Sequence, residues 1–146
     1  GLYLDYKQIQ IDDLRVLREE LELGCVEQVA KRIESAQVAE RLRRSLRVDS
    51  STQEADVLEH ARTFHTELAE LSGNRVLSVF LRVLMELWVR HSAALPIEQS
   101  AQTGPFAPEI ESVHGAIVEA VLAGDTALAK HRMRRHLQAL TEVWRP

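Results

Sequence analysis

Residues 64–84 read FHTELAELSGNRVLSVFLRVL and carry the pattern of two helices joined by a tight turn. Before the turn, apolar side chains recur every three or four positions from Phe64 to Leu71, which is the spacing of one helix face. Gly73 suits the left-handed backbone that ends a helix, and Asn74 can cap the helix that follows. This stretch therefore predicts a helical hairpin.

The same helical spacing runs through the rest of the chain, and no strand-like alternation persists anywhere. Residues 96–108 form the one long loop in this prediction. Short connections elsewhere favour antiparallel neighbours, so the chain predicts an all-α fold, an antiparallel bundle of six to seven helices. We expect helices to begin near Asp12 or Asp13, near Ser35, near Ser51 or Thr52, near Arg75, near Pro108 and after Asp125.

Apolar residues mark the faces that the first and fourth predicted helices turn inward. On the first helix this face holds Leu14, Leu17, Leu21, Cys25 and Val29. The fourth helix is the most apolar of all, with Leu77, Phe80, Leu81, Leu84, Leu87 and Trp88 expected inside.

The composition limits the class of protein. With 146 residues, 45% of them hydrophobic and 27% charged, the chain predicts one globular domain over residues 1–146. Its formal charge of −4 does not favour binding to nucleic acid, which is itself negatively charged. No apolar run approaches the roughly 20 residues that a membrane-spanning helix needs. Cys25 is the single cysteine and no signal-peptide pattern opens the chain, so we expect a cytoplasmic location.

Three histidines lie on helix faces that are otherwise apolar. His65, His114 and His136 each stand three or four positions from apolar residues of the inward stripe. Three imidazoles on three inward faces can converge inside a bundle, and neutral imidazole is a common ligand of zinc and other transition metals. The alternative is that each is a core histidine, hydrogen-bonded to a neighbouring carbonyl or carboxylate. The spacing leaves both interpretations open.

Two further polar residues are candidates for ligand binding. Arg18 sits between Leu14 and Leu21 on an apolar face, where a guanidinium can clamp an effector carboxylate or pair with Glu22 at i+4. Both roles are compatible if Glu22 orients Arg18. His91 continues the apolar face near the end of the fourth helix, where it either interacts with the helix dipole or lines a pocket.

Several of these residues resemble one family of regulatory domains. Residues 64–74 are similar to a stretch of the C-terminal domain of FadR, where a phenylalanine–histidine pair opens a helix that ends in serine or alanine, glycine, asparagine. Near the start, Arg18-Glu19-Glu20-Leu21-Glu22 is similar to the family's first helix, and the later matches are His114, Ile117, Gly124-Asp125, Ala129, Met133, His136 and Leu137. The chain thus resembles the FadR-type C-terminal (FCD) domain of GntR-family transcription regulators.

The resemblance implies a metal site. In many members the three histidines bind a metal together with an aspartate four residues before the first, which implies His65, His114 and His136 as ligands here. His136 follows His114 by 22 positions, as in the family. The aspartate's position holds Ala61, so a divalent ion, zinc or nickel, would rely on the histidines plus water and effector oxygens. The alternative is similarity to the metal-free branch of the family, which uses its pocket directly.

The resemblance also implies a function. We expect a ligand-sensing domain that binds a small carboxylate effector, forms a homodimer, and reaches DNA only through a winged-helix domain absent from this chain and expected upstream. The expected dimer interface is either the line of Val79, Val83 and Leu87 or an exposed face of another helix. We therefore expect no enzymatic activity and no membrane partner.

Two other functions compete with this expectation. A small metalloenzyme could use three histidines with an open position, but no inward carboxylate near them is evident as a general base. A purely structural dimerisation module would use the histidines for packing and would bind neither metal nor effector.

Overall fold

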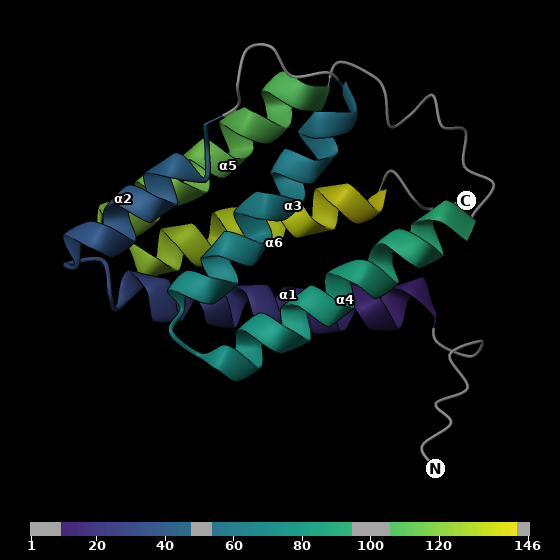
Figure 1. Cartoon of the computed structure of the whole chain (residues 1–146), viewed down its shortest axis with the longest axis horizontal. Coiled ribbons are helices and arrows are strands. Elements are labelled where there is room, and N and C mark those ends of the chain that lie inside the picture. Colours follow the sequence, from purple (N-terminus) through teal and green to yellow (C-terminus); the bar gives the residue numbers. More distant parts are fainter. Residues whose placement is uncertain (1–9, 48–53, 95–105, 143–146) are drawn as a thin grey trace.

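The computed structural model describes residues 10–47, 54–94 and 106–142, and all the regular structure in these ranges is helical (Figure 1). The all-α prediction is therefore confirmed. The six helices are α1 (Ile11–Ala30), α2 (Ala36–Arg44), α3 (Glu54–Leu71), α4 (Arg75–Ala94), α5 (Phe106–Leu122) and α6 (Thr126–Glu142).

Local capping chemistry explains where several helices begin. The Asn74 side-chain oxygen accepts hydrogen bonds from the backbone N–H groups of Val76 and Leu77, at 3.0 and 3.2 Å. The Asp125 carboxylate accepts from the N–H of Leu128 at 2.9 Å. Such bonds satisfy donors that have no partner inside the helix. The predicted starts of α4 and α6 are confirmed.

Other predicted boundaries differ slightly from the structure. Helix α1 begins one residue earlier than Asp12, because the Asp13 carboxylate accepts the backbone N–H of Gln10 at 3.0 Å and draws that turn into the helix. Helix α5 begins at Phe106, two residues before the predicted Pro108. A proline is tolerated there because the N–H groups of a first turn have no helical partner in any case. The predicted start at Ser51 or Thr52 and most of the predicted 96–108 loop lie outside the described residues.

Helix α1 is the central element of the bundle. It packs against α3, α4, α5 and α6, while α2 packs against α3 and α5. Helices α5 and α6 form an antiparallel hairpin, whose turn places Gly124 at a φ of 73°. In Figure 1, α1 and α4 lie side by side, and α3 crosses toward α5 and α6 on the other side of α1. This arrangement brings α1, α3, α5 and α6 around one interior point.

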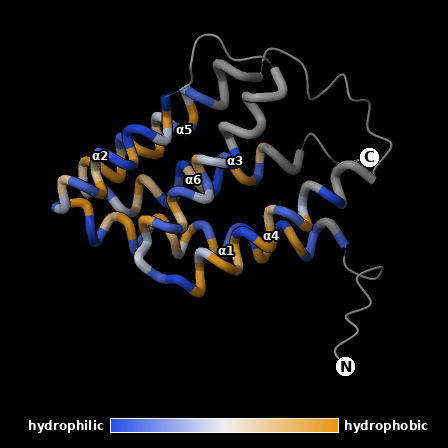
Figure 2. Tube along the Cα trace, viewed as in Figure 1, coloured by the Kyte–Doolittle hydropathy of each residue, from blue (hydrophilic) through white to orange (hydrophobic). Residues whose placement is uncertain are grey.

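Apolar and polar residues alternate along the described parts of the helices, as the colours in Figure 2 show. Apolar side chains from every described helix meet in one core, and burying each of the larger ones stabilises the fold by roughly 1.5–3 kcal/mol. The largest fully buried apolar side chains are Phe64, Leu42, Leu68, Leu81, Ile117, Met133, Val26, Val29 and Val121.

On α1 and α4, two residues that were predicted to face the core are exposed instead. Leu17 is 45% exposed, because Arg18 and Glu22 take the inward positions that follow Leu14 on α1. Phe80 is 59% exposed, because the neighbouring Leu81 takes the inward position on α4. Adjacent residues on a helix point about 100° apart, so only one of each pair can face the core.

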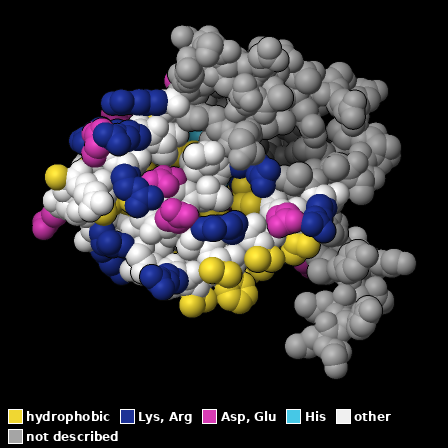
Figure 3. All heavy atoms as spheres, in the orientation of Figure 1, with side chains coloured by type: hydrophobic (Ala, Val, Ile, Leu, Met, Phe, Trp, Pro, Cys, Tyr) yellow, Lys and Arg dark blue, Asp and Glu magenta, His cyan; other side chains and the backbone are white. Residues whose placement is uncertain are grey.

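Helix α4 presents an apolar face to solvent. It consists of Val76, Val79, Phe80 and Val83, each more than half exposed, and we call it the α4 apolar face. Yellow side chains follow the lower edge of the molecule in Figure 3, where α4 runs. Among the described residues, no helix is both long and apolar enough to cross a membrane.

Candidate metal centre

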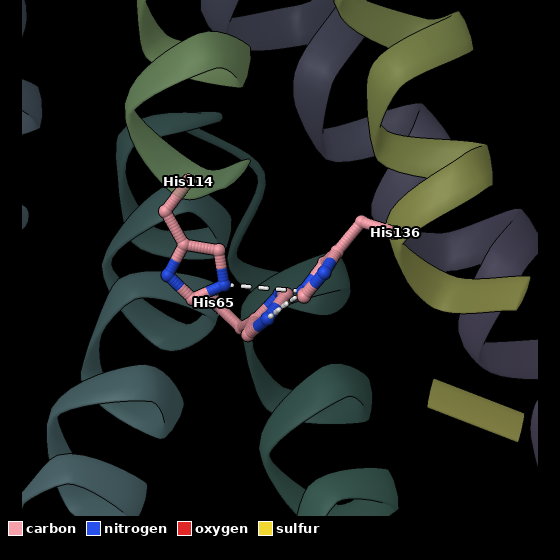
Figure 4. Close-up of side chains that lie close together, drawn as sticks. All are labelled: His65, His114 and His136. Carbon is pink, nitrogen blue, oxygen red and sulfur yellow. Dashed lines mark hydrogen bonds between the residues drawn. The ribbon is translucent and has the colours of Figure 1, made fainter. Parts of the chain in front are cut away.

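Three imidazole rings meet in the interior of the bundle (Figure 4). His65 comes from α3, His114 from α5 and His136 from α6, and all three are buried. The Nε2 atoms of His114 and His136 lie 3.1 Å apart, and those of His136 and His65 lie 3.3 Å apart. One nitrogen from each ring falls within 4.8 Å of the other two. The structure thus brings together the three histidines that the sequence places on separate helices.

The spacing of these nitrogens fits a transition-metal ion. A zinc–nitrogen bond of roughly 2.0–2.1 Å and a tetrahedral angle put two ligand nitrogens roughly 3.3 Å apart. Two of the three separations, 3.1 and 3.3 Å, are close to this value, and the third is no more than 4.8 Å. In a metal-free chain the same separations suit N–H···N hydrogen bonds between the rings. The three histidines could therefore hold a metal ion without a large rearrangement.

A buried carboxylate stands behind the histidines. The Nδ1 atom of His65 contacts Oε2 of Glu22, which α1 places in the core with none of its surface exposed. The sequence pattern makes no inward carboxylate near the histidines evident as a general base, but Glu22 is an inward carboxylate in contact with His65. The i+4 spacing identifies Glu22 only as a partner for Arg18. Its position between Arg18 and Cys25 on the inward line of α1 was the signal that could have revealed it.

Arg18 completes a row of polar contacts. Its Nε donates to Oε1 of Glu22 at 2.7 Å, so the expected i+4 ion pair is present. The guanidinium is 5% exposed and lies over the ring of Trp88, 5.3 Å from the ring centre. Its Nη1 and Nη2 groups make no hydrogen bond to any residue that the structure describes. The contacts thus run from Arg18 through Glu22 and His65 to the other two imidazoles.

The interior charges keep these groups in defined states. Burial alone raises the pKa of Glu22, but the facing His65 and Arg18 outweigh it and lower that pKa to about 2. Burial, reinforced by the neighbouring His65, lowers the pKa of His136 to about 3. Near neutral pH, Glu22 is therefore a carboxylate and His136 a neutral imidazole, the form that can bind a metal.

Phe64 packs against the centre from one side. Its ring stacks on His114 with the centroids 4.0 Å apart and meets His65 edge-on at 5.1 Å. The helical spacing predicts that Phe64 faces the core, but it does not connect Phe64 of α3 with His114 of α5. The apolar ring shields one side of the imidazoles from water.

Two residues named in the sequence analysis are not placed by the structure. His91 lies within α4 and Ala61 within α3, one turn before His65, but their side chains are outside the described residues. The roles considered for them stay predictions. Alanine carries no ligand atom in any conformation, so the absence of a carboxylate at position 61 follows from the sequence alone.

Comparison with known proteins assigns the family. The FCD domain model matches residues 13–139, a span that includes all three histidines, Arg18 and Glu22. Comparison with curated proteins finds no significant match. The match covers most of the chain. The all-helical fold of the chain agrees with the resemblance of its sequence to FadR-type C-terminal domains. The chain belongs to the FCD family, the FadR-type C-terminal effector-binding domains of GntR-type transcription regulators.

Proposed function

We propose that this chain senses a small carboxylate through a divalent metal ion, zinc or nickel, held by His65, His114 and His136. The observation that carries the proposal is the convergence of three buried imidazoles with Nε2 atoms 3.1 and 3.3 Å apart. A bound ion would supply a Lewis-acid position for effector oxygens. Ala61 provides no anionic ligand, and the three imidazoles are neutral when they bind a metal. The positive charge of the ion would therefore be balanced by an anionic effector.

Arg18 is the second contact that we propose for the effector. A buried guanidinium favours a bidentate carboxylate partner, and Glu22 occupies only the Nε of Arg18. Among the described residues the Nη groups have no hydrogen-bond partner, and we propose that they bind an anion that enters beside Trp88. His91 stays in the proposal as a pocket-lining residue, on the basis of its place near the end of α4.

The proposed regulator works as a homodimer in the cytoplasm. The α4 apolar face supports this part of the proposal, since four exposed apolar side chains in one row suit contact with a second copy. DNA is contacted only through a winged-helix domain that is expected upstream of this chain. The effector regulates DNA binding if it favours one arrangement of the two subunits over another.

We propose no enzymatic activity for the domain. Glu22 is the one carboxylate in contact with the histidines in the described part of the chain, but Arg18 and His65 engage both its oxygens. A carboxylate so held, with its pKa near 2, is a poor general base for activating water. Regulation by ligand binding needs no such base.

The metal content of the purified domain tests the proposal. The domain is stripped with a chelator, dialysed against zinc or nickel, freed of excess ion and analysed by mass spectrometry. We expect nearly one ion per chain, and little in a His65→Ala/His114→Ala variant. His131→Ala serves as the control, since His131 is exposed on α6 and should leave the metal content unchanged. A wild-type domain that takes up neither ion overturns the metal site.

The carboxylate is tested separately by thermal unfolding of the metal-loaded domain against a panel of small organic acids. An acid present at about 100 times its dissociation constant should stabilise the native state by about 2.7 kcal/mol. Arg18→Gln should abolish this gain, whereas Arg135→Gln, at an exposed position on α6, should retain it. Equal stabilisation of both variants would remove Arg18 from the proposed effector site.

A further inference from the structure

Glu22 connects two parts of the interior that have different chemistry. One of its oxygens faces Nδ1 of His65 and the other accepts the Nε–H of Arg18 at 2.7 Å. It reaches this position from α1, whereas the three histidines come from α3, α5 and α6. A fully buried carboxylate is costly to desolvate and is retained only with such partners.

The contact with Glu22 determines which nitrogen of His65 carries the proton. An ionised carboxylate can only accept hydrogen bonds, so Nδ1 of His65 must be the donor. In a neutral imidazole the other nitrogen is then unprotonated. For His65 that nitrogen is Nε2, which faces Nε2 of His136 at 3.3 Å. The lone pair of His65 is thus directed into the histidine cluster.

We propose that Glu22 is the positioning residue of this centre, holding His65 in the Nδ1–H form so that its Nε2 lone pair is available to a metal ion. This inference rests on the proposed metal site. Carboxylates that accept the second N–H of a ligand histidine are a general device for fixing ring orientation and increasing the basicity of the ligand. Here the device comes from a helix that carries none of the three histidines.

Arg18 makes the role of Glu22 specific to a carboxylate. Two donors, the Nε–H of Arg18 and the Nδ1–H of His65, require two acceptor oxygens. A glutamine at position 22 has only one side-chain oxygen. Arg18 cannot lose its proton, so it always requires an acceptor. The glutamine oxygen therefore turns to Arg18, and its NH2 group faces His65. That NH2 group favours the opposite tautomer, with the proton on Nε2 and the lone pair directed away from the cluster.

The first test reads the tautomer in the metal-free domain, by long-range proton–nitrogen NMR correlations of the histidine rings. Wild type should show the proton of His65 on Nδ1, and Glu22→Gln should move it to Nε2. Arg18→Met combined with Glu22→Gln frees the glutamine oxygen and should return the proton to Nδ1. Glu20→Gln, exposed on the same helix, should leave the wild-type pattern. A wild-type domain with the proton on Nε2 overturns the inference whether or not metal binds.

The second test is zinc affinity, measured by competition with a chromogenic chelator. Glu22→Gln should bind zinc roughly 10- to 100-fold more weakly than wild type. The double variant with Arg18→Met should recover part of this loss, which a merely structural role for Glu22 would not produce. If wild type binds zinc and Glu22→Gln binds it equally well, the positioning role fails and the metal site stands. If wild type binds no zinc, the proposed function fails and the NMR result alone decides the role of Glu22.

Discussion

Phe64 and His114 stack nearly face to face, with ring centroids 4.0 Å apart and ring planes at 20° to each other. Phe64 is fully buried, so its removal leaves a cavity beside the imidazole. We expect Phe64→Ala to lower the free energy of unfolding by about 3–5 kcal/mol, measured by urea denaturation. Leu17→Ala is the control, because Leu17 is 45% exposed and its truncation should cost about 0.5 kcal/mol or less. Equal costs for the two would contradict the packing described here.

Two glycines should respond in opposite directions to the same substitution. Gly24 lies inside α1 and a Cβ there would meet no atom within 4 Å, so Gly24→Ala should raise the free energy of unfolding by roughly 0.5–1 kcal/mol. Gly124 has a φ of 73°, which strains an L-residue, so Gly124→Ala should lower it by roughly 1–2 kcal/mol although space is open there too. Thermal unfolding of both variants checks the signs. If both substitutions changed the free energy of unfolding in the same direction, the difference in backbone conformation between Gly24 and Gly124 would not explain their effects.

The metal-free domain should lose stability as the pH falls. The folded-state pKa of His136 is about 3, below its ordinary value of 6.5. Between these values the unfolded chain takes up a proton that native His136 does not, so acid favours unfolding by up to about 1.4 kcal/mol per pH unit. Glu22, with its pKa lowered to about 2, acts in the same direction below pH 4.5. Urea midpoints in chelator should therefore fall from pH 7 to pH 5, and His136→Gln should flatten that slope. An equally steep slope in the variant would exclude His136 as its cause.

Charges on the α4 apolar face should separate the proposed dimer. A Val79→Asp/Val83→Asp variant places two carboxylates where a second copy would pack, so light scattering should report the mass of one chain instead of two. Its zinc content should stay that of wild type, because both residues are exposed on α4, away from the buried histidines. Arg43→Asp, exposed on α2, is the control that should remain dimeric. A double variant that stays dimeric would place the interface on another face.

The Cys25 thiol should be inert in the folded domain. It is completely buried, and desolvation together with the nearby Glu22 carboxylate raises its pKa to about 12. We expect an aromatic disulfide reagent at pH 8 to label it only as fast as the domain unfolds. Labelling should become immediate in denaturant. Rapid labelling under native conditions would show that α1 opens locally around this residue.

The helices and several of their ends could be predicted because they depend on neighbours in the sequence. Asn74 and Asp125 cap the helices that they precede through bonds that span only two or three residues. Which residues face inward depends on more than the local sequence. On α1 both Leu17 and Arg18 continue the helical repeat from Leu14, and hydropathy favours the leucine. The structure buries Arg18 and exposes Leu17, because the guanidinium has two partners. One is Glu22, which the i+4 spacing predicts, and the other is Trp88 of α4, which no local pattern reveals.

The candidate site was predictable in its histidines but not in its surroundings. Polar residues in apolar stripes stand out, and this singled out His65, His114 and His136. Glu22 lies 43 positions from His65 in the sequence, and a glutamate on a helix is ordinarily assigned to solvent. Its contact with His65 depends on how α1 crosses α3, which is decided by packing across the whole core.

The packing of α1 against α6 also affects how the domain folds during synthesis. Lys130 of α6 donates to Glu27 of α1 across 103 positions, so the first described helix finds a main partner in the last one. Contacts this distant in sequence slow folding, because a long segment must be closed before they form. During synthesis, α1 leaves the ribosome about a hundred residues ahead of α6, at roughly 5–20 residues per second. For those seconds the apolar residues of α1 lack the partners on α6 that cover them in the folded domain, and exposed apolar surface of this kind favours aggregation.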